Sequence, residues 1–228
     1  MKLALTFAAM MALCPAGACL ADSVKLPYEM VGAYSLPVTS MKAARFRAMV
    51  HQQFDFSCGS AALSTLLTYH YGFKVSEQTV FEEMYAIGDQ SKIRREGFSL
   101  FDMKRYLENH GFQADGFEAP LDKLQSAGIP AIVLINENGY NHFVVIKGLR
   151  DGRVLVGDPS GGTRAMSQAA FETLWTNGIL FVISNRQELA QFNVASEWSA
   201  LPRAPIANGI SRDGLSGLVI PKAGPSDF

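Results

Sequence analysis

The chain has 228 residues, of which 48% are hydrophobic and 18% are charged, and its formal net charge is -1, from 20 basic and 21 acidic side chains. No long run of either charge occurs, which argues against binding to nucleic acid or to an anionic membrane surface. The length suffices for one domain with a sizeable core, which excludes a small scaffold held together by disulfides.

The N-terminus has the pattern of a secretory signal peptide. A lysine at position 2 is followed by an apolar stretch, a proline and several small residues, so residues 1–21 are predicted to be removed on export rather than to span a membrane. Both Ala18 and Ala21 fit a cleavage site. Cleavage before Cys19 would allow a lipid anchor there, but the preceding residues lack the leucine of a lipoprotein box, so a periplasmic or secreted protein without lipid is expected.

The segment that follows begins with a lead-in and continues as helices. Residues 22–50 form the lead-in, whose last ten residues are expected to be a short helix or strand. Beyond it, apolar residues recur at helical spacing and the runs end at glycines. The predicted helices run from Cys58 for about 14 residues to Gly72, from Ser76 to Gly88, and from Ser99 to His110, the last with Asp102 completing a capping box.

After Gly111 the chain changes to short runs rich in β-branched residues. Two hairpin signals, Asn138-Gly139 and Asp151-Gly152, separate them and favour antiparallel pairing. The strands are predicted at 131–135, 142–147, 153–157 and 179–184, with a short helix at 167–175. Helices followed by strands predict an α+β domain over residues 22–185. Residues 186–228 contain four prolines and are expected to be an extended or partly disordered tail.

Cys58 is the chemically most informative residue. The other cysteines, Cys14 and Cys19, lie in the predicted signal peptide, so the mature chain is expected to carry one thiol. Cys58 opens a predicted helix, where unpaired backbone N–H groups and the helix dipole stabilise a thiolate. Gln52 lies six residues earlier, and its side-chain amide is suited to donate to an oxyanion. A buried structural cysteine is the plain alternative, which these surroundings disfavour.

A thiol nucleophile needs a base, and the chain has four histidines. His70 lies twelve residues along the same predicted helix as Cys58, which places it ~18 Å away. His110 sits at a helix end, where an imidazole commonly meets free carbonyls. His51 precedes a turn that would have to fold back. His142 remains, at the start of a strand, where a rigid element can hold it toward the helix terminus.

The imidazole in turn needs an acceptor that fixes its tautomer. Asp158 follows His142 by sixteen residues, at the end of the next predicted strand, so a hairpin would bring the two side chains together. The plain alternative is that Asp158-Pro159 only initiates a turn. The glycines that follow, Gly161 and Gly162, are interpreted as a turn rather than as a self-cleavage site.

Three segments together match a known pattern: Gln-x5-Cys-Gly-x-Ala from Gln52, His-Phe-Val-Val from His142, and Asp-Pro-x-x-Gly from Asp158. In this order they resemble the bacteriocin-processing, double-glycine cysteine peptidases, which are papain-like, over about residues 50–184. The resemblance implies Cys58 as nucleophile, His142 as base and then acid, Asp158 as the residue that orients it, and Gln52 as oxyanion donor. Gln53 fits the spacing less well.

The chain departs from the transporter-fused members of that family. It contains no Gly-x4-Gly-Lys-Ser/Thr loop of a transporter ATPase, and it resembles the stand-alone, exported branch, including the peptidase-like proteins of functional-amyloid secretion systems. The expected partner is a secreted or outer-membrane polypeptide, and whether a double-glycine motif is recognised stays open. No cofactor is implied, and the histidines lack metal-ligand spacing. Arg94 and Arg95 are expected in a solvated loop.

Two alternatives use the same residues. In the first, the fold serves as a non-catalytic peptide-binding or assembly factor. In the second, the triad carries out another acyl transfer, as in an amidase or transamidase. The motif does not separate acyl transfer to water from acyl transfer to an amine.

Overall fold

The computed structural model describes residues 23–25, 35–37, 39–175 and 177–199. The predicted signal peptide and most of the predicted tail lie outside the described residues. The chain divides into two compact units, residues 1–43 and 44–228. In the first unit, β1 (Ser23–Lys25) pairs antiparallel with β2 (Ser35–Pro37). Among the described residues, no helix has both the length and the apolar character needed to cross a membrane.

Helices dominate the first half of the described chain, as the apolar spacing predicts. Ser99 and Asp102 form the predicted capping box, in which Ser99 Oγ accepts from the Asp102 N–H and the Asp102 carboxylate accepts from the Ser99 N–H. The helices are α1 (Met41–Arg45), α2 (Cys58–Thr65), which continues as a π-helical turn (Leu66–His70), α3 (Glu77–Ile87), α4 (Gln90–Glu96), α5 (Leu100–Asn109), α6 (Asp122–Ala127), α7 (Gln168–Leu174) and α8 (Ala195–Ser199).

A six-stranded antiparallel sheet forms the second half, with strand order β3-β8-β4-β5-β6-β7. Its strands are β3 (Ala114–Glu118), β4 (Ala131–Glu137), β5 (Tyr140–Arg150), β6 (Arg153–Asp158), β7 (Gly162–Ser167) and β8 (Ile179–Ile183). Both predicted hairpin turns have positive φ at their two central residues, Asn138-Gly139 and Asp151-Gly152, as two-residue hairpins require. The α+β prediction is confirmed.

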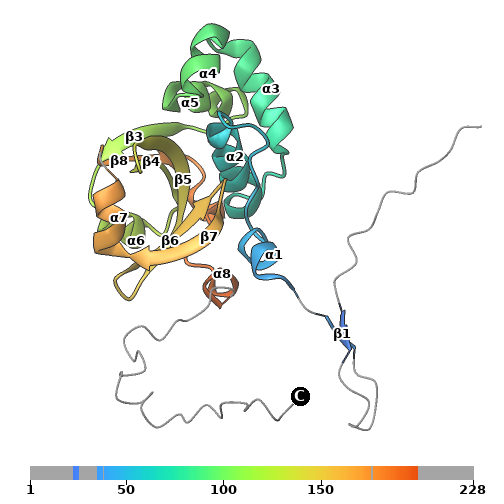
Figure 1. The fold of residues 1–228 in the computed structure, drawn as a ribbon. Coiled ribbons are helices and arrows are strands. Elements are labelled where there is room, and N and C mark those ends of the chain that lie inside the picture. Colours follow the sequence, from blue (N-terminus) through green and yellow to red (C-terminus); the bar gives the residue numbers. More distant parts are fainter. Residues whose placement is uncertain (1–22, 26–34, 38, 176, 200–228) are drawn as a thin grey trace, which may run out of the picture. The chain divides into compact units, whose positions relative to one another are not determined.

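The sheet is strongly curved (Figure 1), and each of its faces carries a separate apolar layer. On one face, Val145 and Phe181 pack with residues of α2, α3 and α5, including Leu63. On the other face, Val144 and Val156 pack with residues of α6 and α7. Because strand residues alternate between faces, neighbouring positions such as Val144 and Val145 belong to different layers. The sheet therefore lies between two groups of helices.

The structure adds elements that the sequence patterns did not predict. The edge strands β3 and β7 and the helix α6 were absent from the prediction. The segment with Arg94 and Arg95 forms α4 rather than a loop; its N-cap Asp89 accepts from the Ser91 and Lys92 N–H groups, and it ends at Gly97, whose φ is 77°. An aspartate N-cap and a glycine end are recognisable signals for this helix.

The beginning of the predicted tail also differs from expectation. Residues Gln187–Leu189 form a 3-10 turn and residues Ala195–Ser199 form α8, whose Trp198 is buried. The Asn193 side chain accepts from the Leu149 N–H on β5, and the Asn193 N–H donates to the Lys147 carbonyl. This part packs on the sheet instead of extending away from it, because it supplies polar partners to β5.

Candidate active site

Cys58 is the first residue of α2, and it is 8% exposed. Ser57, at the N-cap position, gives no side-chain cap to the helix; its hydroxyl instead donates to the Phe54 carbonyl. The Ser57 side chain therefore accepts no hydrogen bond from the N–H groups in the first turn of α2, the turn that contains Cys58. Gly59 allows α2 to approach α5, since a Cβ there would lie 2.9 Å from Met103 Cε.

His142 and Asp158 meet across the β5–β6 hairpin. Val145 faces Gly157 in the register, which brings the start of β5 beside the end of β6. His142 Nε2 lies 3.0 Å from Asp158 Oδ1, and each side chain is 5% exposed. The juxtaposition that the hairpin predicts is therefore present, and the catalytic roles of the two residues stay predictions.

The charge state of the pair follows from its surroundings. Burial opposes the imidazolium form of His142, but the hydrogen bond and charge of Asp158, together with the charge of Cys58, outweigh it and raise the pKa of His142 to about 9. The second ring nitrogen, Nδ1, is buried and makes no hydrogen bond within the described residues. With Nε2 held by Asp158, Nδ1 is the nitrogen left for the thiol.

Asp158 is surrounded by donors. Its Oδ1 also accepts from the Ser160 N–H at 2.8 Å, the Ser160 hydroxyl at 2.7 Å and the Gly161 N–H at 3.1 Å. Burial disfavours the carboxylate, but the hydrogen bond and charge of His142 and the bonds from Ser160 hold the pKa of Asp158 well below its usual range. Asp158 thus accepts hydrogen bonds from the turn and also contacts the imidazole, so the two interpretations of Asp158-Pro159 are compatible.

Gln52 lies in the loop that leads to α2. Its N–H donates to the Pro159 carbonyl at 3.0 Å, which joins this loop to the end of β6. Its side-chain Nε2 donates to the Phe54 carbonyl at 3.1 Å, and its Oε1 is buried without a partner in the described residues. The amide has two protons, so one remains for an oxyanion. Gln53 is exposed.

The other histidines have separate roles. His70 is buried, with Nδ1 2.6 Å from the Gln191 carbonyl, and burial and the Lys147 charge lower its pKa to about 4. His110 Nε2 lies 3.3 Å from Glu83. His51 Nδ1 lies 2.7 Å from the adjacent Gln52 carbonyl. These contacts agree with the choice of His142 as the partner of Cys58.

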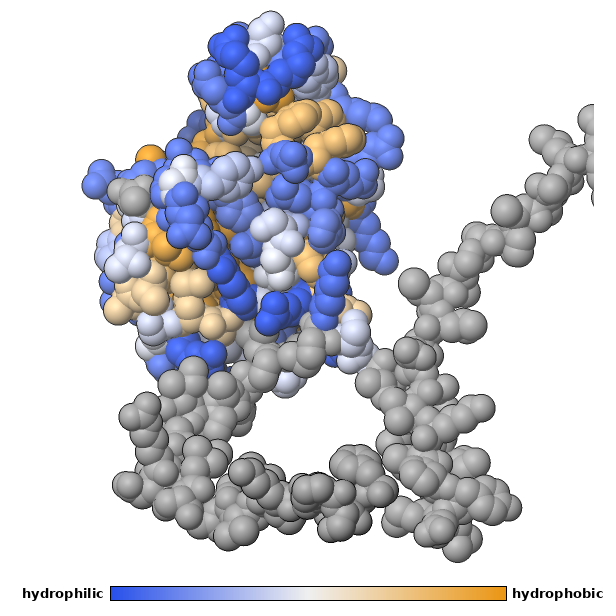
Figure 2. Space-filling model, viewed as in Figure 1, coloured by the Kyte–Doolittle hydropathy of each residue, from blue (hydrophilic) through white to orange (hydrophobic). Residues whose placement is uncertain are grey.

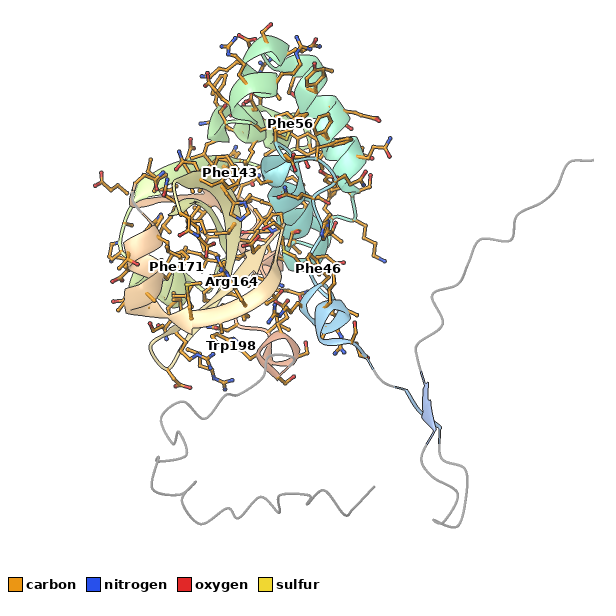
Figure 3. The ribbon with its side chains drawn as sticks, in the orientation of Figure 1. Phe46, Phe56, Phe143, Arg164, Phe171 and Trp198 are labelled. Carbon is orange, nitrogen blue, oxygen red and sulfur yellow. The ribbon has the colours of Figure 1, made fainter. Side chains whose placement is uncertain are left out.

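A cleft of about 740 Å³ leads to Cys58. The β4–β5 hairpin contributes one side, including Tyr140 and Phe143, and residues 94–101 of α4 and α5 contribute the other. Phe143 lies on the sheet and Phe56 on the loop before α2 (Figure 3). Apolar side chains are also exposed around α2 and α3, below the hydrophilic end of the unit at α4 (Figure 2). The cleft is mainly apolar, as suits a peptide substrate.

Two features of this cleft were not anticipated from the sequence. Arg94 and Arg95, expected in a solvated loop, line the cleft from α4. Tyr140 donates its hydroxyl to the Asp55 carbonyl at 2.8 Å and thereby connects the β4–β5 hairpin to the loop before Cys58. Within the part of the chain that the structure describes, no cluster of three or more potential metal ligands occurs.

Comparison with known proteins finds similar sequences and similar solved structures. The sequence pattern of the Peptidase C39 family matches residues 47–187. A protein from Pseudomonas aeruginosa named probable functional amyloid protease FapD is 42% identical over 146 residues, which are 64% of this chain and 64% of that protein. The protein of the same name from Pseudomonas fluorescens matches with the same identity and coverage. The chain thus spans less than two thirds of the length of both relatives.

Solved structures show the same fold. The peptidase domain of Streptococcus ComA, described as a bifunctional ABC transporter involved in quorum sensing, is 21% identical with a TM-score of 0.51, over 60% of this chain and 97% of that chain. A double glycine motif protease from an AMS/PCAT transporter, solved with its leader peptide, is 26% identical with a TM-score of 0.50, over 59% of this chain and 89% of that chain.

Proposed function

The chain belongs to the Peptidase C39 family, and we propose that it is an exported cysteine endopeptidase that acts through Cys58, His142 and Asp158. The observation that carries this proposal is the buried His142–Asp158 pair, whose imidazole is under the charge of Cys58, a residue that lines a mainly apolar cleft. A nucleophile, a base and an orienting carboxylate in this arrangement are the components of acyl transfer.

The proposed reaction has two steps. The Cys58 thiolate attacks the scissile carbonyl, and the imidazolium of His142 gives its proton to the leaving amine, which leaves a thioester on Cys58. Neutral His142 then takes a proton from water, whose oxygen attacks the thioester and releases the second product and the Cys58 thiolate, so that the starting thiolate and imidazolium are restored. The Gln52 amide and the Cys58 N–H would donate to the oxyanion in both steps.

The proposed substrate is a polypeptide of the secreted or envelope fraction. The predicted signal peptide supports a periplasmic or secreted location. The relatives at 42% identity carry the name of a functional amyloid protease, which supports a substrate in an amyloid secretion system. Cell fractionation, with mass determination of the mature N-terminus, tests the location; a chain that keeps residues 1–21 in the cytoplasm would contradict it.

The experiment for the activity compares cells with the wild type, Cys58→Ala and Cys58→Ser. Mass spectrometry of secreted and envelope proteins should show peptide termini that occur only in the wild type. A purified substrate should then be cut by the wild type and bound without cleavage by Cys58→Ala. Identical termini in all three strains, with fibre assembly unchanged in Cys58→Ala, would contradict the peptidase and support the non-catalytic assembly factor.

A further inference from the structure

A second charged pair, Arg164 and Glu137, lies next to Asp158. It is close to the carboxylate oxygen Oδ2, whereas His142 contacts Oδ1. Arg164 on β7 forms a two-pronged bond with Glu137 at the end of β4, with Nη1 3.0 Å from Oε1 and Nη2 2.7 Å from Oε2. Arg164 Nη2 also lies 3.5 Å from Asp158 Oδ2, the oxygen that makes no other contact with a donor in the described residues. Glu137 and Arg164 are twenty-seven residues apart in sequence.

These groups share one face of the sheet. Alternate residues of a strand point to the same side, so Glu137 shares a face with Ile135, and Asp158 with Val156. Ile135 and Val156 belong to the same apolar layer, and Val156 is the cross-strand partner of Arg164. His142 lies on the same face, because it is two residues before Val144, which belongs to that layer. Four neighbouring strands, β4 to β7, therefore each contribute one polar side chain at this end of the sheet.

We propose that Arg164 and Glu137 are positioning residues that hold the Asp158 carboxylate from behind and balance the charge that acts on His142. The inference rests on the role proposed above for His142 and deepens it. Arg164 fixes the second oxygen of Asp158, while Glu137 neutralises the guanidinium so that its positive charge does not oppose the imidazolium. The bidentate geometry suits arginine and is not reproduced by lysine.

The charges around His142 make this proposal specific. Hydrogen bonds from Arg164 hold the pKa of Glu137 below its usual range, and the charge of His142 lowers it further, so Glu137 and His142 act on each other. The titratable groups that contact the imidazole or share a charge interaction with it are Glu137 of β4, Tyr140 of β5, Asp158 of β6 and Cys58 of α2. Arg164 of β7 lies one contact further away, on Asp158.

Removing the two partners should shift the titration of His142 in opposite directions. Arg164→Gln leaves two carboxylates that favour the imidazolium, so the pKa of His142 should rise. Glu137→Gln leaves an unbalanced guanidinium beside Asp158, so the pKa of His142 should fall. Each shift should be about half a pH unit or more, and the double variant should lie between them. A pair whose charges do not act on the imidazole would not give shifts of opposite sign.

The measurement is an NMR titration of His142 in the full chain carrying Cys58→Ala, which removes both catalysis and the coupled thiol. A further His142→Gln variant assigns the signal. Arg153→Gln, which removes a positive charge at the exposed far end of β6, is the matched control and should leave the titration unchanged. Arg164→Lys keeps the positive charge but loses the bidentate bond to Glu137. It should therefore shift the pKa of His142 less than Arg164→Gln does.

The outcomes separate this inference from the proposed function. Opposite shifts support the positioning role even if the chain cleaves nothing. Shifts of the same sign, or no shift in variants that keep the circular dichroism spectrum of the parent, overturn it even if cleavage by the wild type is established. Both side chains are about one third exposed, 32% for Arg164 and 38% for Glu137, so the variants should fold.

Discussion

Lys147, in the middle of β5, has no exposed side-chain surface, and its ammonium pairs with Glu197 of α8. The ammonium also donates to the Ala48 carbonyl at 2.7 Å. Gly157 on β6 makes room for it, because a Cβ there would lie 2.9 Å from Lys147 Cδ. A helix beyond the family match, which ends at residue 187, thus neutralises a buried charge on the strand that carries His142.

Glu197→Gln should destabilise the unit strongly, because it leaves the Lys147 ammonium buried without a counter-charge. Removing one partner of a buried pair costs about 3–5 kcal/mol. Urea unfolding should show this loss, while Glu188→Gln, at an exposed carboxylate in the same segment, should change stability little. The double variant Lys147→Met with Glu197→Gln should recover much of the loss. Equal midpoints for the two single variants would contradict the role of α8.

Cys58 should react with iodoacetamide faster in the wild type than in His142→Gln, because the proposed mechanism pairs the sulfur with the imidazole of His142. The two rates should be compared at one pH, on proteins that give the same circular dichroism spectrum. Equal rates would remove the pairing of Cys58 with His142 from the mechanism.

Turnover is predicted to fall at alkaline pH, where His142 loses its proton. The pKa of His142 is raised to about 9, so the imidazolium that protonates the leaving amine is present below that value and is lost as the pH rises through it. The stability that the raised pKa contributes is complete below the ordinary value of 6.5 and disappears over the same upper range. Turnover should therefore fall above about pH 9. An alkaline limb near pH 6.5 would contradict this environment for His142.

Asp158→Asn should keep the fold and reduce turnover by about 10²- to 10⁴-fold. The amide oxygen can still accept from Ser160 and Gly161, but it carries no charge to stabilise the imidazolium. The alkaline limb should also move to lower pH. Asp151→Asn is the matched control, because Asp151 is an exposed turn residue with φ of 52°, which asparagine tolerates. Similar turnover in both variants would exclude Asp158 from the site.

Gln52→Ala should reduce kcat by about 10²- to 10³-fold with little change in KM, as expected for a donor that acts mainly on the oxyanion. Gln53→Ala should leave kcat near that of the wild type, because Gln53 is exposed. The backbone bond from Gln52 to Pro159 is retained in the alanine variant, so the loop should stay in place. A larger effect of Gln53→Ala would assign the donor role to that residue.

Several parts of the site could be predicted because their signals are local. Cys58 follows a polar loop and precedes an apolar helix, and His142 and Asp158 lie at strand ends joined by an Asp-Gly turn. Such patterns depend on neighbours in sequence, which backbone preferences and hydrophobic periodicity govern. The α+β class followed from the same signals.

Other parts depend on contacts between distant segments. The edge strands β3 and β7 have weak strand sequences, Ala-Asp-Gly-Phe-Glu and Gly-Thr-Arg-Ala-Met-Ser, and they form because β8 and β6 offer free backbone partners. Sequence spacing cannot predict the Glu137–Arg164 bond, since it requires the order β4-β5-β6-β7. The residues proposed to react can therefore be recognised in the sequence alone. The charged groups around them come together only through strand pairing, because their separation in sequence carries no signal.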